Sequence, residues 1–355
     1  MSDLPNGRIG VLSFMGIGDN IMAIQALQFF ELNGGQILWM CKEESADIVS
    51  AFLENCRVVP LKGTMKRWKA NTILGLIRHM VRYVKIAKDL NISTAVILDY
   101  RPFPVLFFSL VLRLGRFGAV AASFEKGWSA LFLTTKHRMV LYEHKHEVER
   151  YYDLFSDALK PALSSGALYS SLRKRQVVLK TVGSYIREGR RPIIGIVPGS
   201  ARTFKRWRSQ NFKSLVSQIV TLGYDVIIFG SSTEREECLA IAGDFSEHRV
   251  SVVAGQMSLL EQGLISTECR VVVTNDTAFM HLADLLGVKV IGLFGVTRPE
   301  RCGPFSQRHN VVKASIDGAG SYVYGSFKDW DDSCINSIGV EEVLRKVFEL
   351  LKDRA

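Results

Sequence analysis

Short apolar runs alternate with amphipathic stretches along most of the chain. In residues 271–295 an apolar strand leads into the polar turn 274–277, which is followed by a helix over 278–286 and a second apolar strand. Asp276 or Thr277 can cap this helix. A βαβ unit of this kind presents backbone N–H groups and a positive helix end at the carboxyl edge of a parallel sheet, where α/β folds bind phosphorylated ligands. An ordinary strand–helix corner is the alternative reading of these residues.

The same alternation runs through both halves of the sequence. It predicts strands over residues 8–14, 36–41, 57–60 and 93–99, then 192–197, 224–229 and 249–253. It predicts helices over residues 20–32, 44–54, 71–89 and 144–159, then 209–222, 234–242, 258–265 and 340–351. We therefore expect an α/β protein with two Rossmann-like, doubly wound parallel-sheet domains that face each other across a cleft.

The domain boundary is expected where this periodicity breaks, between residues 160 and 191. The predicted domains are 1–165 and 166–338, with a closing helix over 339–355. A length of 355 residues with 47% hydrophobic and 23% charged residues fits two soluble globular domains.

No apolar run reaches the roughly 18–20 residues that cross a bilayer, and the longest candidate, 102–112, is too short. The N-terminus shows no signal-peptide pattern, and the 6 cysteines are scattered without a CxxC pair. These features favour a cytoplasmic protein with reduced thiols.

The formal net charge of +10 indicates an anionic partner. No nucleic-acid-binding module is recognisable, so a phosphorylated ligand or an acidic membrane surface is favoured. Basic residues crowd the helix 71–89 and its approach: Lys66, Arg67, Lys69, Arg78, Arg82, Lys85 and Lys88. This pattern fits a solvated helix face or a patch for an anionic acceptor or membrane.

Two loops of the second half carry candidate phosphate or nucleoside chemistry. Pro198-Gly199-Ser200 follows a strand, and Lys205 lies five residues further on, although the spacing is not that of a Walker A loop. Glu234 opens a helix after another strand, where a carboxylate can bind ribose hydroxyls or simply favour the helix dipole. His281 follows Asp276 by about one and a half helical turns and can return to the same edge.

In the first half, Gly16-Ile17-Gly18-Asp19 follows the first strand without completing a dinucleotide fingerprint. Asp19 is a candidate general base, or else a helix N-cap. Two metal readings are disfavoured. His144 and His146 start a helix with rings that point apart, and the Asp329-Trp330-Asp331 stretch lies after the parallel sheet is complete.

These motifs together resemble glycosyltransferase family 9, the heptosyltransferases of lipopolysaccharide core synthesis, over nearly the whole chain. Residues 18–19 resemble the family's GD motif, and residues 198–200 with 205–207 resemble its phosphate loop and K-x-W element. Residues 230–234 are similar to its G-x-x-x-E segment. Residues 276–283 resemble the D-T-G-x-x-H-L-A signature, the most specific of the set.

The resemblance implies a GT-B fold in which the domain 1–165 binds the acceptor and the domain 166–338 binds the nucleotide-sugar. It also implies roles for individual residues. Asp19 is expected to be the catalytic base, with Gly18, Asp99 and Arg101 on the acceptor side. Donor or nucleotide binding is expected of these residues: Ser200, Ala201, Lys205, Glu234, Asp276, Thr277, Ala278, Phe279 and His281.

The implied reaction is an inverting transfer, without metal or cofactor, from ADP-L-glycero-D-manno-heptose to an anionic, lipid-linked lipopolysaccharide-core or related glycan. Contact with the inner-membrane surface is a further expectation. Ala278 in place of the usual Gly, and Ser13 where a basic residue is common, leave donor and acceptor identity open. The alternatives are a glycosyltransferase for another nucleotide-sugar or acceptor, a sugar epimerase, and a non-catalytic nucleotide-sugar-binding protein.

Overall fold

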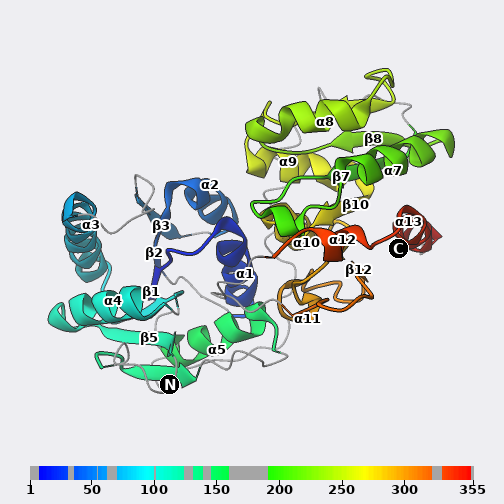
Figure 1. Ribbon diagram of the computed structural model, residues 1–355. Coiled ribbons are helices and arrows are strands. Elements are labelled where there is room, and N and C mark those ends of the chain that lie inside the picture. Colours follow the sequence, from blue (N-terminus) through cyan, green and yellow to red (C-terminus); the bar gives the residue numbers. More distant parts are fainter. Residues whose placement is uncertain are drawn as a thin grey trace. The chain divides into compact units, whose positions relative to one another are not determined.

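Two parallel β-sheets, each flanked by helices, are built from the alternating pattern (Figure 1). The computed structural model describes residues 8–30, 36–53, 55–61, 70–99, 101–123, 131–138, 145–159, 191–321 and 330–352. The described residues up to 138, together with 147–159, form the first unit; Lys145, His146 and the residues from 191 onward form the second. The expectation of two parallel-sheet α/β domains is confirmed.

The first unit contains six strands and five helices in its described part. Its strands are β1 (Ile9–Leu12), β2 (Ile37–Lys42), β3 (Cys56–Leu61), β4 (Thr94–Ile97), β5 (Gly118–Ser123) and β6 (Thr135–Arg138). Its helices are α1 (Ile17–Leu27), α2 (Glu43–Phe52), α3 (Ala70–Asp89), α4 (Pro102–Leu114) and α5 (Glu147–Leu159).

The described part of the second unit also carries six strands. They are β7 (Ile193–Val197), β8 (Asp225–Ile228), β9 (Val250–Val252), β10 (Cys269–Asn275), β11 (Val290–Phe294) and β12 (Val311–Lys313). Its helices are α7 (Ser209–Thr221), α8 (Arg235–Ala242), α9 (Leu259–Ile265), α10 (Ala278–Leu285), α11 (Pro299–Cys302), α12 (Ser333–Asn336) and α13 (Val340–Lys352). Three short 3₁₀ turns complete it: η3 (Thr203–Lys205), η4 (Ser232–Glu234) and η5 (Ser266–Glu268).

The two sheets have the same topology. The first has the order β3-β2-β1-β4-β5-β6, and the second has the order β9-β8-β7-β10-β11-β12. Every strand pair is parallel. The direction in which successive strands are added to the sheet reverses between β1 and β4 and between β7 and β10. Ligands of open α/β sheets bind at the carboxyl ends of such neighbouring strands, the topological switch point.

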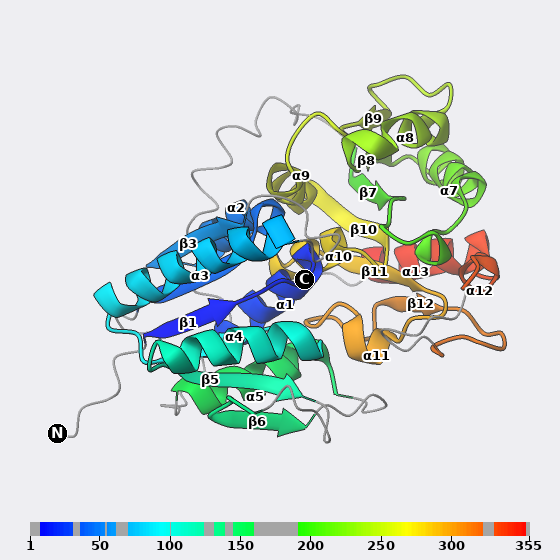
Figure 2. The same cartoon turned by 60° about the vertical axis from the view of Figure 1, so that its left-hand side comes forward.

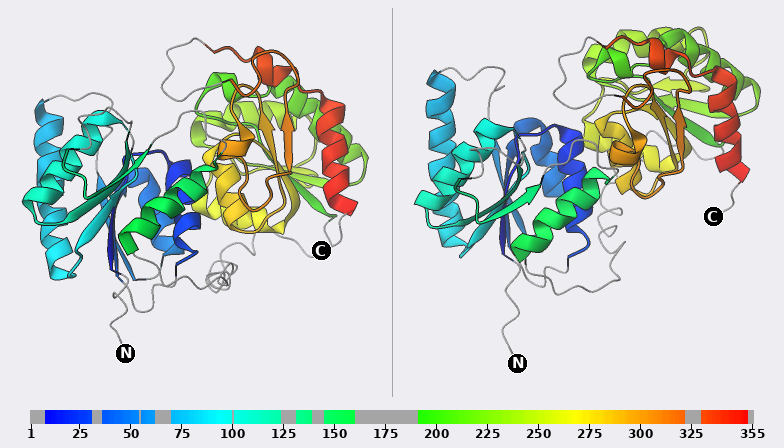
Figure 3. Two further views of the ribbon diagram at one scale, coloured as in Figure 1. Left: turned by 90° about the horizontal axis from the view of Figure 1, so that it is seen from below. Right: turned by 60° about the horizontal axis from the view of Figure 1, so that its bottom comes forward.

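Each sheet is sandwiched between helix layers because its strands are apolar on both faces. In the first unit α3 and α4 cover one face, and α1 and α5 pack together on the other (Figure 3). In the second unit α7, α8 and α13 enclose a core around Trp207 and Phe212, both fully buried. The helix predicted over 340–351 thus packs as part of this second core.

Two helix starts differ from the prediction, and one helix was not predicted. Helix α1 begins at Ile17 rather than residue 20, and α5 begins at Glu147 rather than residue 144. Helix α4 was not predicted because it is apolar on nearly every side and shows no amphipathic period. Residues 160–190, which hold nearly all of the expected domain boundary, lie outside the described residues. Lys66, Arg67 and Lys69 lie outside them as well. Within the described residues, no helix combines the length and apolar character that crossing a bilayer demands.

Candidate functional site

The carboxyl edge of the second sheet brings together two loops that are about seventy residues apart in the chain. Strands β7 and β10 pair with Val197 opposite Thr274, so the segments after them leave the sheet side by side. The Lys205 ammonium, from η3, lies 2.6 Å from Oδ2 of Asp276, which follows β10. The Lys205 side chain is 21% exposed and that of Asp276 only 6%. The Lys205 ammonium is therefore held at the carboxyl ends of β7 and β10 and stays partly accessible to solvent.

Asp276 is surrounded by groups that stabilise its charged form. Burial alone would raise the pKa of the Asp276 carboxyl, but the Lys205 charge and hydrogen bond, together with His281 and Thr297, hold it below its usual value. The Thr297 hydroxyl, beyond the end of β11, adds a hydrogen bond that also lowers this pKa. The Cys302 sulfur lies 3.8 Å from Oδ2 of Asp276 and 3.3 Å from the Arg298 carbonyl oxygen, and its one hydrogen can be donated to either. The Asp276 carboxylate is therefore ionised and holds the Lys205 ammonium in place.

His281 lies in the second turn of α10 and is 4% exposed. Burial lowers the pKa of its imidazole from 6.5 to about 4; Asp276 opposes this shift and Lys205 adds to it. The ring is therefore neutral near pH 7. Its Nδ1 atom is buried without a hydrogen-bond partner, which marks a polar group that a ligand or water can satisfy. The predicted return of His281 toward Asp276 is confirmed.

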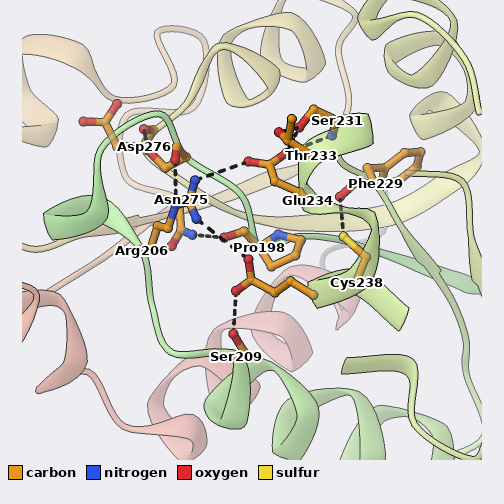
Figure 4. Close-up of polar contacts among 12 residues, drawn as sticks. Pro198, Arg206, Ser209, Phe229, Ser231, Thr233, Glu234, Cys238, Asn275 and Asp276 are labelled. Atoms are coloured by element: carbon orange, nitrogen blue, oxygen red, sulfur yellow. Dashed lines mark hydrogen bonds and ion pairs between the residues drawn. The ribbon is translucent and has the colours of Figure 1, made fainter. Parts of the chain in front are cut away.

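Asn275 braces the two loops against each other, as Figure 4 shows. Its amide donates to the Pro198 carbonyl over 2.6 Å, and its Oδ1 accepts from the Trp207 backbone N–H over 3.2 Å. The Ser200 hydroxyl donates to the Asp276 carbonyl over 3.3 Å and is buried. Ser200 therefore joins the loops in this structure, and its predicted contact with phosphate stays a prediction.

Glu234 closes the other side of the loop after β7 (Figure 4). Its Oε2 accepts from the backbone N–H and the hydroxyl of Ser231, at 2.8 and 2.7 Å. The carboxylate also lies against Gly199, where an added Cβ would overlap Oε1. Arg206 lies 3.9 Å from Oε1 and donates to the Ser200 carbonyl over 2.7 Å. Glu234 is thus placed beside the phosphate-loop candidate, with one oxygen already engaged.

The N-terminus of α10 lies at the same edge. Thr277 occupies the N-cap position with extended backbone, and its side chain makes no capping hydrogen bond. Ala278 opens the helix with an ordinary negative φ, so Ala serves where the family more often has Gly. The Phe279 ring packs on Phe229 at 4.9 Å, so only its backbone can serve a ligand. Ala201 is exposed in the facing loop.

The equivalent edge of the first sheet carries Asp19. This residue lies in the first turn of α1, where Oδ2 accepts from the Gly16 N–H over 3.2 Å. The alternative of Asp19 as N-cap is therefore wrong, because Gly16 takes that position and the carboxylate reaches back to it. Oδ1 accepts from the Tyr151 hydroxyl of α5 over 3.1 Å. Asp19 and Gly18 are both half-buried, so the carboxylate is positioned yet reachable.

Asp99 and Arg101 lie beside this position, after β4. The Leu98 N–H donates to the Leu12 carbonyl and aligns the ends of β1 and β4. Asp99 is buried and paired with Arg101, whose terminal nitrogen lies 2.6 Å from Oδ2 while its side chain stays 47% exposed. Arg101 therefore presents a guanidinium at the edge with its orientation set by Asp99.

The two disfavoured metal readings find other roles for their described members. His146 is buried, with Nε2 3.0 Å from the Gly303 carbonyl, and Asp331 accepts a hydrogen bond from the Ser333 N–H at the start of α12. His144 and Asp329 lie outside the described residues. Among the residues that the structure describes, no three His, Cys, Asp or Glu side chains group as metal ligands do.

Sequence reasoning missed three residues that shape these edges. Asn275 was noticed only as a turn former, and nothing in its local pattern indicated a brace to Pro198 and Trp207. Thr297 and Tyr151 come from elements far along the chain, and no local signal pointed to their contacts with Asp276 and Asp19.

Comparisons with known proteins address the family directly. The family model described as glycosyltransferase family 9 (heptosyltransferase) matches residues 109–323, more than half of the chain. Lipooligosaccharide heptosyltransferase 2 of Haemophilus influenzae is 33% identical over 170 residues, which are 46% of this chain and 48% of that protein. The chain thus spans about half the length of the curated relatives that it matches.

Solved structures show the same fold over nearly the full length. The structure of Escherichia coli ADP-heptose LPS heptosyltransferase II aligns with a TM-score of 0.72 at 20% identity and covers 97% of this chain and 98% of that one. A family 9 glycosyltransferase from Veillonella parvula gives a TM-score of 0.76 at 20% identity, with 99% of both chains covered.

The matched range contains the whole of the second unit's edge, including Lys205, Asp276 and His281. The sequence motifs, the sheet order and the family match thus agree. This chain belongs to glycosyltransferase family 9, the heptosyltransferase family.

Proposed function

We propose that the protein transfers a heptosyl group from ADP-L-glycero-D-manno-heptose to a hydroxyl group of a lipopolysaccharide-core acceptor, with inversion at the anomeric carbon. The observation that carries the proposal is the Lys205–Asp276 pair at the switch point of the second sheet, inside the region that matches the family. The donor follows from relatives, since the similar Escherichia coli structure is named for ADP-heptose.

The donor diphosphate is assigned to the carboxyl edge of the second sheet. As the sugar leaves, negative charge develops on ADP, and Lys205 with the N–H groups at the start of α10 would stabilise it. Asp276 sets the position of Lys205 by its 2.6 Å contact, so little reorganisation is needed during reaction. Glu234, next to the phosphate loop, is assigned to the ribose.

The acceptor is assigned to the edge of the first sheet. The acceptor oxygen attacks the anomeric carbon opposite to ADP, and the Asp19 carboxylate takes its proton as the C–O bond to ADP breaks. The Tyr151 hydroxyl, which donates to Oδ1, fixes the direction of the Asp19 carboxylate. Arg101 supplies a positive charge for the anionic acceptor.

The test is a transfer assay with purified protein. ADP-heptose, UDP-sugars and GDP-sugars are each incubated with a panel of truncated lipopolysaccharide cores, and free nucleotide and acceptor mass are measured. We expect ADP release together with an acceptor heavier by one heptose, and NMR of the new linkage is expected to show inversion. Added EDTA is expected to leave the rate unchanged, since Lys205 rather than a metal neutralises the leaving group.

Variants separate the assigned roles. Asp19→Asn is expected to lower kcat about 10²–10⁴-fold, and Lys205→Met about 10²–10³-fold. Asp89→Asn and Lys213→Met, at exposed positions outside both edges, serve as matched controls. Near-normal turnover in both test variants would refute the assignment, and absence of any acceptor product with every donor would favour a non-catalytic binding protein.

The acceptor also suggests a location. A lipid-linked lipopolysaccharide core is assembled on a membrane, so we place the protein in the cytoplasm with its acceptor at the inner-membrane surface. Fractionation of cells into soluble and membrane parts, at low and high salt, tests this placement.

A further inference from the structure

Helices α3 and α4 lie along the same face of the first sheet, as Figure 2 shows. Their inner sides are buried: Leu76, Met80 and Tyr83 of α3 and Phe108 and Leu112 of α4 join one core with the strands. The outer side of these two helices is called the α3/α4 face below. This face carries exposed apolar and basic side chains that take no part in the core.

Four large apolar side chains are exposed on the α3/α4 face, two on each helix. The exposed fractions are 44% for Ile77, 64% for Val81, 44% for Phe103 and 76% for Leu114. These four belong to a set of 9 large hydrophobic side chains that are exposed in the described part of the chain. The four members of that set in the second unit are dispersed over separate elements: Leu222, Leu239, Phe245 and Ile316. Isolated exposed apolar residues are normal, whereas a group on adjacent helices indicates an interaction surface.

The charges on the same face are almost all positive. On α3 the exposed basic residues are Arg78, Arg82, Lys85 and Lys88, and at the end of α4 they are Arg113 and Arg116. Asp89 is the one acidic residue in the described lengths of α3 and α4. Among the described residues, no carboxylate lies within ion-pair distance of these six basic side chains.

The order of residues along α3 mixes the two kinds of side chain. Ile77 and Val81 are one turn apart, and Arg78 and Arg82 form the neighbouring row. A solvated helix face normally carries both signs of charge and few large apolar groups. Apolar groups bordered by unpaired cations instead fit an anionic lipid surface, where the apolar groups enter the headgroup region and the cations meet lipid phosphates.

We propose that the α3/α4 face docks on a lipid bilayer that contains anionic lipids. The charge of the face and that of the bilayer are complementary, and the exposed apolar groups supply the part of the binding that salt does not screen.

The position of the face gives docking a consequence for the reaction, which rests on the proposed function. Helix α4 begins at Pro102, directly after the Asp99–Arg101 pair, and Phe103 is exposed in its first turn. The start of the docking face therefore adjoins the edge assigned to the acceptor. Docking would hold that edge near the headgroups, where the sugar of a lipid-linked acceptor begins.

Vesicle co-sedimentation of the full-length protein tests the proposal without donor or turnover. We expect binding to vesicles of phosphatidylethanolamine with phosphatidylglycerol and little binding to phosphatidylcholine alone. Arg78→Gln/Arg82→Gln/Lys85→Gln is expected to weaken the partition coefficient by about a hundredfold, since each basic side chain near an anionic surface contributes about fivefold. Ile77→Ser/Val81→Ser is expected to weaken it by about tenfold.

A matched control removes the same charge elsewhere. Lys213→Gln/Arg270→Gln/Arg345→Gln replaces three exposed basic residues of the second unit, and it is expected to bind vesicles like the unmodified protein. Circular dichroism and melting verify that all variants fold.

Three results would overturn the proposal: equal loss in the control, no loss in the apolar variant, or binding that a soluble truncated core oligosaccharide abolishes. The last two would indicate a surface for a soluble polyanion. Because the readout is lipid binding alone, failure of heptosyl transfer would leave this result unaffected.

Discussion

Protonation of His281 is expected to destabilise the second unit in mild acid. The pKa of a histidine in an unfolded chain is near 6.5, whereas burial holds that of His281 at about 4 in the folded protein. Between these values the unfolded chain binds a proton that the folded protein does not. The stability associated with neutral His281 is therefore complete above pH 6.5 and is lost progressively as the pH falls toward 4.

The linkage relation gives the size of this effect. At pH 5 the two pKa values correspond to a loss of about 2 kcal/mol in the free energy of unfolding relative to pH 7. The Asp276 carboxyl does not confuse the measurement, because its pKa is lowered from 3.8 and it therefore titrates below this range. Burial also lowers the pKa of His79, in the first unit, so the contribution of His281 is the difference between the unmodified protein and His281→Gln.

Urea unfolding at pH 7, 6 and 5, followed by tryptophan fluorescence, measures the effect. The fully buried Trp207 contributes the signal of the second unit, and the fully buried Trp39 contributes that of the first. His281→Gln removes the titrating group and is expected to lose about 2 kcal/mol less than the unmodified protein between pH 7 and 5. His309→Gln, at an exposed position, is the matched control and is expected to keep the full loss. If His281→Gln also keeps it, the reasoning from burial is refuted.

Three further predictions concern the same edge. Lys205→Met leaves the Asp276 carboxylate buried without its cation, so we expect about 3 kcal/mol of destabilisation in urea unfolding. The double variant with Asp276→Asn should lose much less stability than the sum of the two single variants, and additive losses would contradict the pairing. Gly199→Ala places a Cβ against the Glu234 carboxylate, so this side chain must turn away and lose its hydrogen bonds with Ser231; we expect about 1 kcal/mol of destabilisation by the same measurement, and unchanged stability would contradict the contact. Asn275→Ala leaves the Pro198 carbonyl and the Trp207 N–H buried without their partner, so we expect about 2 kcal/mol of destabilisation and faster hydrogen exchange over residues 198–207. Unchanged exchange would show that Asn275 does not hold the two loops together.

Local sequence patterns determined the elements and their polarity. The apolar run before residue 276, the polar turn and the helix that follows form β10 and α10 almost as predicted, because strand and helix periods depend on near neighbours. The carboxyl-edge position of Asp19, Ser200 and Asp276 follows in the same way, since each comes directly after a strand of a parallel sheet.

The helix α4 shows where such reasoning ends. Its apolar residues have no period, so the sequence could only exclude a membrane span, and the helix and its exposed outer side emerged from packing on β4 and β5. The start of α1 was misplaced for a related reason. The contact of Asp19 with the Gly16 N–H extends the helix by one turn toward the strand.

The tertiary structure alone decided which side chains meet. Lys205 and Asp276 are 71 residues apart, and Tyr151 and Asp19 are 132 apart. They meet because strand order places β7 beside β10 and because α5 packs on α1, whereas periodicity carries no information about either pairing. The sequence alone thus determined which residues lie at the carboxyl edge of each sheet. The order of the strands determined which partner each of these residues meets, and with it the residue's charge state and burial.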